Sequence, residues 1–298
     1  MTPEGMGRVV LWVWTLLVAI FILTPLIVLA AISVTPEDYI SLPIRGVSLR
    51  WYADMLRHPN FLDAARNSLL LAVEAAATAL AAGTLLAIAV TRFRFPGRGL
   101  VTLIASAPLF IPLVMSGLAI RIFFSTFAFD TPALRLYAAH VALTVPFVVR
   151  LVSASLAGFD WNQEAAARNL GASPARAFAE ITLPQIAQGV IAGGIFALIV
   201  SFDDVGMSIF LTGADYTTLP IELFAAASYE LTPTVAAISV AMILFSALSV
   251  LVIERWFGVQ KMFGGELGSE DTRQPAGRLT GRRCHFTHVS QVQRRGPG

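Results

Sequence analysis

The chain has 298 residues, of which 56% are hydrophobic and 13% are charged, and its mean hydropathy is +0.72. A soluble domain carries about 25% charged residues, so this composition excludes a soluble protein and indicates an integral membrane protein. The net charge of +2 implies no nucleic-acid partner, and one cysteine, Cys284, cannot form a disulfide framework or a zinc site.

Six apolar stretches are long enough to cross about 30 Å of hydrocarbon, which takes about 20 helical residues. They are Val9–Ile32, Ser68–Val90, Leu100–Phe127, Leu134–Leu156, Ile186–Leu211 and Val235–Trp256. The first stretch is too long for a signal peptide and no small-residue cleavage site is evident after it, so we expect a retained helix. The sequence therefore predicts an all-α integral membrane protein with six transmembrane helices.

This pattern divides the chain into three parts. Residues 1–66 hold the first transmembrane helix and a periplasmic loop, and residues 67–258 hold a five-helix core. Residues 259–298 form a polar cytoplasmic tail rich in glycine, arginine and serine, which we expect to be disordered.

Two of the expected helices carry small residues at every fourth position. These residues are Ala75, Ala79, Gly83 and Ala87 in the second helix, and Gly189, Gly193, Ala197 and Ser201 in the fifth. Small residues let helix backbones approach closely in lipid. The two faces predict a packed transporter core, a seam between subunits, or ordinary packing within the chain.

Basic residues indicate the orientation, because they are enriched in cytoplasmic loops. They crowd the second loop, the fourth loop and the region after the last helix, whereas the fifth loop, residues 212–234, has three acidic residues and no basic one. The first loop carries four arginines and dilutes the signal. We expect even-numbered loops and both termini to be cytoplasmic.

Four ionisable residues lie at membrane depth, where charges are costly and are candidates for function. They are Glu74, Arg121, Asp203 and Asp204. One interpretation is a net negative substrate pathway, which would attract a cation. The other is a structural network, in which Arg121 pairs with one carboxylate and another carboxylate caps an unwound turn. His140 and Pro146, on the fourth helix, are consistent with a polar bend, but simple packing and kinking is the expected interpretation.

A polar break between the fourth and fifth apolar stretches predicts two short helices joined by a sharp turn. Residues 164–170 favour a helix, and Gly171 suits the left-handed position that ends it. Ser173 can cap a second helix that begins at Pro174, and Pro184 is expected to break that helix before the next apolar run.

This break resembles the EAA loop of the membrane subunit of bacterial binding-protein-dependent ABC importers. The matching positions are Glu164, Ala165, Ala166, Gly171, Ile181, Leu183 and Pro184. The resemblance implies a MetI-like, type I importer permease in the bacterial inner membrane, with residues 160–185 as the loop that contacts the ATPase. It also implies two ATPase subunits, a second permease subunit, either a paralogue or an identical copy, and a periplasmic solute-binding protein.

The chain itself lacks a Walker A motif, because its single lysine, Lys261, is followed by Met262. We therefore expect no cofactor on this chain and ATP on a separate one. No catalytic or metal-binding arrangement stands out. Asp203 and Asp204 are adjacent on one expected helix, about 100° apart, and do not face each other as a catalytic pair would.

Three further segments resemble the spermidine/putrescine branch of these permeases. They are residues 67–69 (Asn-Ser-Leu), 201–204 (Ser-Phe-Asp-Asp) and 217–220 (Thr-Thr-Leu-Pro). The resemblance implies a polyamine or similar cationic solute, with Asp203 and Asp204 near its path. The alternatives are a permease for another solute, such as an aminophosphonate or an opine, and a stand-alone secondary transporter, which would typically show inverted repeats.

Overall fold

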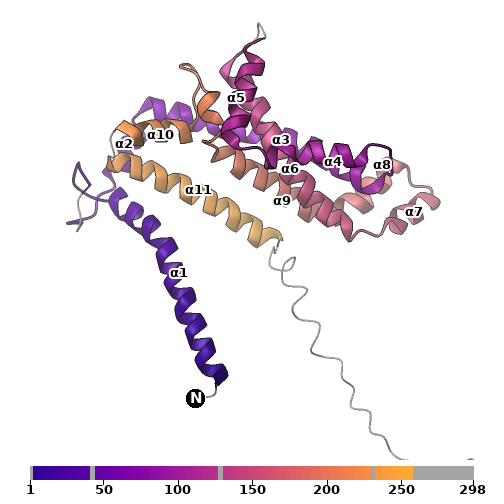
Figure 1. The fold of residues 1–298 in the computed structure, drawn as a ribbon. Coiled ribbons are helices and arrows are strands. Elements are labelled where there is room, and N and C mark those ends of the chain that lie inside the picture. Colours follow the sequence, from indigo (N-terminus) through magenta and orange to yellow (C-terminus); the bar gives the residue numbers. More distant parts are fainter. Residues whose placement is uncertain (1–2, 41–43, 127–129, 230–231, 258–298) are drawn as a thin grey trace, which may run out of the picture. The chain divides into compact units, whose positions relative to one another are not determined.

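The computed structural model describes residues 3–40, 44–126, 130–229 and 232–257. The chain divides into two units, residues 1–258 and 259–298, and the described residues all belong to the first (Figure 1). The predicted disordered tail and its single cysteine therefore lie outside the described residues.

The described residues are almost entirely helical. The long helices are α1 (Pro3–Ser33), α3 (Pro59–Arg92), α6 (Pro132–Ala157), α9 (Leu183–Phe202) and α11 (Pro233–Phe257). The shorter elements are α2 (Arg50–Met55), α4 (Arg98–Ser106), η1 (Ala107–Leu109), α5 (Leu113–Phe124), α7 (Trp161–Asn169), α8 (Pro174–Ala177), η2 (Phe178–Thr182), η3 (Ser208–Phe210) and α10 (Leu219–Tyr229).

Five helices in the described part of the chain are long and apolar enough to cross a membrane. The third predicted span is present but is not one straight helix, because α4 with η1 and α5 meet at 105°. Two prolines explain the break: Pro108 lies in η1, and Pro112 precedes the first residue of α5. Proline has no N–H to donate to a continuing helix. If the bent pair counts as one span, the described residues hold six candidate spans, the number that the sequence predicts.

The fifth predicted span ends earlier than expected. The sequence predicts a helix to Leu211, but α9 ends at Phe202, and Asp203 is its C-cap residue. The chain then turns and forms η3, a short 3-10 helix. The helix therefore ends at Asp203 and Asp204, and the residues that follow form a turn around the carboxylate of Asp204.

The core of the described unit is formed by α3, α6 and α9, which pack against one another (Figure 1). Both predicted small-residue faces are buried in this core. A Cβ atom at Gly83 would lie 2.8 Å from the Cβ of Val148, and one at Gly193 would lie 3.3 Å from the Cα of Val148. The two faces thus let α3 and α9 approach the same point of α6, which confirms packing within the chain and removes the need for a seam between subunits.

Candidate functional site

The predicted helix–turn–helix between the fourth and fifth spans is confirmed in its local geometry. Asp160 caps α7 by accepting a hydrogen bond from the N–H of Asn162 at 3.0 Å, and Ser173 caps α8 by accepting one from the N–H of Arg176 at 3.3 Å. Between them, Gly171 has φ of +96°, and its N–H donates to the carbonyl of Arg168. Because the N–H of Ala172 donates to the carbonyl of Ala167, α7 ends in a complete Schellman motif.

The positive φ of Gly171 gives a first prediction. A Cβ atom there would meet nothing within 4 Å, so Gly171→Ala introduces backbone strain without a steric clash. The strain should cost the loop about 1 kcal/mol. We expect faster proteolysis of the 170–174 segment in membranes with little change in the melting temperature of the solubilised protein. Gly99→Ala, in helix α4 and also without a neighbour, is the control, and equal proteolysis of both variants would contradict the prediction.

The seven residues that match the EAA pattern do not share one exposed face. Glu164 is buried, with 2% of its surface exposed, and Ile181 is partly buried. The other five are exposed: Ala165, Ala166, Gly171, Leu183 and Pro184. Leu170, beside the turn, is 90% exposed and lies at the tip of the loop. The exposed residues that match the pattern are thus small or apolar, polar residues such as Arg168 and Asn169 are exposed beside them, and the glutamate is buried.

Pro184 does not break the second helix, contrary to the sequence prediction. The chain runs from α8 through a π-helical turn, η2, into α9, and the N–H of Leu183 donates to the carbonyl of Phe178. A regular α-helix would leave the carbonyl of Glu180 without its donor, because the donor would be the missing N–H of Pro184. The wider turn accommodates the proline, so the loop continues directly into a core helix.

The two carboxylates at the end of α9 have different surroundings. Asp203 is exposed and accepts a hydrogen bond at 3.0 Å from Ser246 of α11. Asp204 is buried and accepts hydrogen bonds from the N–H of Met207 at 3.5 Å and from the N–H and hydroxyl of Ser208 at 2.9 and 2.8 Å. Asp204 therefore caps the turn after α9, whereas Asp203 is exposed at the end of the helix and is bound by a neutral hydroxyl.

His140 holds the same turn from α6. Its Nδ1 atom lies 2.7 Å from the hydroxyl of Ser201, and its Nε2 atom lies 2.9 Å from the hydroxyl of Ser208. The ring is 1% exposed, and Nε2 is 3.9 Å from a carboxylate oxygen of Asp204. The expectation of simple packing for His140 is therefore wrong, because both ring nitrogens bind groups that precede and follow the break.

Asp203 lines two cavities. A cavity of about 580 Å³ separates the 203–206 turn from η1 and the start of α5, and its apolar wall includes Leu143, Phe147 and Val200. A second cavity of about 780 Å³ lies between the turn, α10 and α11, and Ser246 lines it together with apolar residues. The same carboxylate therefore faces two spaces with predominantly apolar walls, and Asp204 contributes to the first of them.

Glu74 lies elsewhere on the protein. It is exposed on α3 and is not among the residues that line either of these cavities. Its charge is close enough to affect Tyr216, in the loop before α10: burial raises the pKa of that phenol above its ordinary value, and the negative charge of Glu74 raises it further. The structure thus separates Glu74 from the pair at the end of α9.

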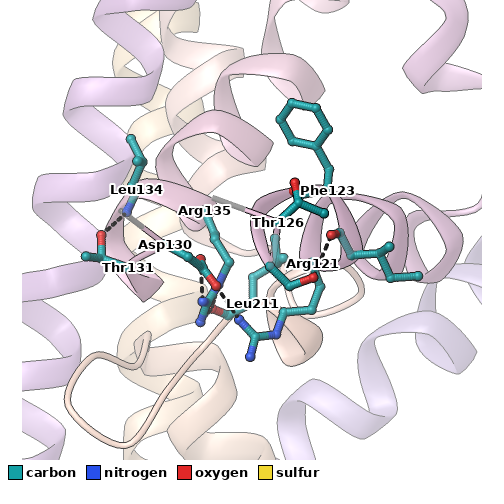
Figure 2. A network of polar contacts seen from close by, with 10 residues as sticks. Arg121, Phe123, Thr126, Asp130, Thr131, Leu134, Arg135 and Leu211 are labelled. Carbon is teal, nitrogen blue, oxygen red and sulfur yellow. Dashed lines mark hydrogen bonds and ion pairs between the residues drawn. The ribbon is translucent and has the colours of Figure 1, made fainter. Parts of the chain in front are cut away.

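Arg121 belongs to a polar network whose carboxylate, Asp130, was not among the residues that the sequence indicated (Figure 2). Its guanidinium donates to one oxygen of Asp130 at 3.0 Å, and the buried Arg135 donates to the other oxygen at 2.6 Å. Arg135 also donates to the carbonyl of Leu211, at 3.1 Å from Nη2. These contacts join the end of α5, the start of α6 and the turn after η3. Arg121 therefore has the paired, structural role that was one of its two interpretations.

Comparison with known proteins identifies the family. The family model described as "Binding-protein-dependent transport system inner membrane component" matches residues 79–260. The chain is 31% identical to the putrescine transport system permease protein PotI of Escherichia coli (strain K12), over 80% of this chain and 86% of that protein. It is 29% identical to the spermidine/putrescine transport system permease protein PotC of the same strain, over 78% of this chain and 87% of PotC.

The fold agrees with that assignment. A crystal structure of a bacterial ABC transporter involved in the import of the acidic polysaccharide alginate contains a chain with a TM-score of 0.69 and 16% sequence identity. The match covers 86% of the present chain and 98% of the other. At this identity the likeness concerns the fold alone, and it supports the predicted MetI-like permease architecture. The chain belongs to the family of inner membrane components of binding-protein-dependent transport systems.

Proposed function

We propose that this permease subunit imports a putrescine- or spermidine-like cationic amine across the bacterial inner membrane. The observation that carries the proposal is the exposed carboxylate of Asp203 between two cavities with apolar walls. A polyamine has the matching chemistry, because its ammonium groups pair with a carboxylate and its methylene segments pack against apolar side chains. Two relatives that cover most of the chain, PotI and PotC, are named as permeases for such solutes.

The alternative of an anion-bearing solute, such as an aminophosphonate, has less support. Such a solute would be expected to contact Arg121, but Asp130 already binds that guanidinium and also binds Arg135 (Figure 2). An anionic solute would have to compete with this carboxylate for the arginine. At Asp203, by contrast, a cationic solute meets a carboxylate that accepts a hydrogen bond from the uncharged hydroxyl of Ser246.

As a component of a binding-protein-dependent importer, the chain works with an ATPase and a solute-binding protein, and ATP hydrolysis belongs to the separate ATPase chain. We propose that the second permease subunit is a paralogue and that both chain termini are cytoplasmic. The distribution of arginine supports this orientation, because three arginines lie between the end of α3 and the start of α4 and two more lie in the loop around α7 and α8. The exposed residues of the 160–185 loop would then face the ATPase.

Uptake by the assembled transporter tests the proposed solute. The permease, its partner permease, the ATPase and the binding protein are reconstituted in proteoliposomes, and ATP-dependent uptake of labelled putrescine is measured with and without competitors. We expect spermidine to compete and an aminophosphonate not to compete. Competition by the aminophosphonate, together with no putrescine uptake, would overturn the proposal.

Asp203→Asn tests the carboxylate directly. Loss of one charge partner for a partly desolvated ammonium should reduce uptake at low putrescine concentration about ten-fold or more. Asp215→Asn, an exposed acid in the loop before α10, is the matched control and should leave uptake unchanged. Ser246→Ala removes the hydroxyl that binds Asp203 but keeps the charge, so its effect should be smaller. Normal uptake by Asp203→Asn would exclude Asp203 from the pathway.

A further inference from the structure

The buried carboxylate of Glu164 has both of its oxygen atoms occupied by groups of its own chain. Arg92, the last residue of α3, donates from Nη2 to Oε1 at 2.7 Å and from Nη1 to Oε2 at 3.0 Å. The hydroxyl of Thr182 donates to Oε2 at 2.9 Å. The arginine is thus bidentate, which is the strongest and most directional form of this ion pair. Little of the carboxylate is left for another protein to contact.

Each of these contacts reaches a different element. Arg92 comes from α3, Glu164 from α7, and Thr182 from the π-helical turn that continues into α9. The guanidinium also lies over the ring of Trp161, 4.9 Å from its centroid, at the first residue of α7. Its position in the last turn of α3 is favourable for a cation, because the carbonyl end of a helix carries partial negative charge. Four side chains therefore fasten the start of the loop to two core helices.

We propose that Arg92, Glu164 and Thr182 form a clamp that makes the coupling loop move with α3 and α9. In this arrangement Glu164 is a positioning residue inside the permease, and the ATPase contacts the exposed residues of the loop around Ala165 and Leu170 instead. The inference rests on the chain being the permease of an ATP-driven importer. It does not depend on which solute is moved.

The clamp should respond unequally to the loss of its two charges. Glu164 is 3% exposed at its side chain, whereas the side chain of Arg92 is 28% exposed. Removing Arg92 leaves a buried, uncompensated carboxylate, which is strongly unfavourable. Removing the charge of Glu164 leaves an arginine that reaches water, and a glutamine there retains an acceptor. Arg92→Lys keeps the charge but cannot form the bidentate pair, so its effect should be intermediate.

A buried thiol in the loop reports whether the contacts of the clamp hold the loop against the core helices. Ala177, in α8, is 1% exposed, and Cys284→Ser with Ala177→Cys gives a permease with one thiol at this buried position. In membranes that contain the complete transporter, we expect a water-soluble maleimide to label this thiol about ten-fold faster or more with Arg92→Gln than without it. Glu164→Gln and Arg92→Lys should give smaller increases.

Arg176→Gln is the matched control, because Arg176 lies in the same loop and pairs with Glu180 at 2.9 Å while both side chains are more than half exposed. It should leave the labelling rate unchanged. Equal rates for Arg92→Gln and Arg176→Gln would overturn the clamp. It would also be overturned if Glu164→Gln released the ATPase from the membrane while Arg92→Gln left the thiol protected, because Glu164 would then be a contact to the ATPase.

A second readout separates coupling from folding. In proteoliposomes with putrescine as the probe, Arg92→Gln should keep the ATPase bound and hydrolysing ATP, but should lower putrescine uptake per ATP hydrolysed. An unchanged ratio of uptake to hydrolysis would show that the contact only stabilises the fold. If the wild-type transporter does not move putrescine, the proposed solute is wrong, and the labelling rates still decide whether the clamp exists.

Discussion

Asp204→Ala is expected to lower the free energy of unfolding of the solubilised permease by about 3 kcal/mol. Asp204 is buried, and its carboxylate accepts hydrogen bonds from both the N–H and the hydroxyl of Ser208 and from the N–H of Met207. Alanine leaves these donors without an acceptor in a place that water reaches poorly. Each such group costs about 1–3 kcal/mol, so the loss is large even if part of the turn rearranges.

The measurement is the melting temperature of the permease in detergent. It is monitored by size-exclusion chromatography with detection of a fused fluorescent reporter. Asp215→Ala, which removes an exposed acid from the following loop, is the control and should melt like the wild type. His140→Gln should lie between the two, because it removes the ring that binds Ser201 and Ser208 but leaves the cap itself. A wild-type melting temperature for Asp204→Ala would show that the carboxylate does not hold the turn.

Gly189→Ala is the second substitution with a large expected effect, at about 2 kcal/mol of destabilisation. A Cβ atom at Gly189 would overlap the hydroxyl of Ser155 and lie 2.7 Å from the carbonyl oxygen of Leu151. The serine can rotate, but the carbonyl belongs to the backbone of α6. The two helices would have to separate at this point of close approach.

Gly194→Ala, five residues further along α9, is a strict control. Its Cβ atom would meet the Cδ2 atom of Leu80 at 3.2 Å, which is the movable end of a side chain. Alanine also favours a helix over glycine by about 1 kcal/mol, so this variant should be neutral or slightly stabilised. Equal melting temperatures for the two variants would contradict the close approach of α6 and α9.

The membrane spans could be predicted from sequence because their cause is local. A run of about 20 apolar residues is sufficient to identify a span, and α1, α3, α6 and α11 each contain their predicted stretch or nearly all of it. The angle within the third span has a less local cause. Pro108 and Pro112 are visible in the sequence, but the direction of α5 also depends on Gly117, where an added Cβ would lie 2.6 Å from the carbonyl of Met207.

The candidate site was harder to predict, because its contacts join distant residues. The local pattern around Gly171 predicted the turn correctly. Nothing local indicates that Glu164 is buried, since its partner Arg92 lies 72 residues earlier and serves in the sequence only as a sign of orientation. The role of Asp130 could not be predicted for a related reason. It binds Arg121, but it lies outside the apolar stretches, where a charged residue is not unusual. Side-chain partners across the fold have no signature in a single sequence.

Helix α3 has a mechanical consequence. It is 34 residues long, has no proline after its first residue, and spans about 50 Å at the usual rise per residue. Near its first turns, the hydroxyl of Ser68 accepts the N–H of Leu219, the first residue of α10, at 2.7 Å. At its last residue, Arg92 binds Glu164. One continuous helix is therefore bound to α10 near its start and to α7 at its last residue, so a displacement of one of these contacts would be transmitted along the helix to the other.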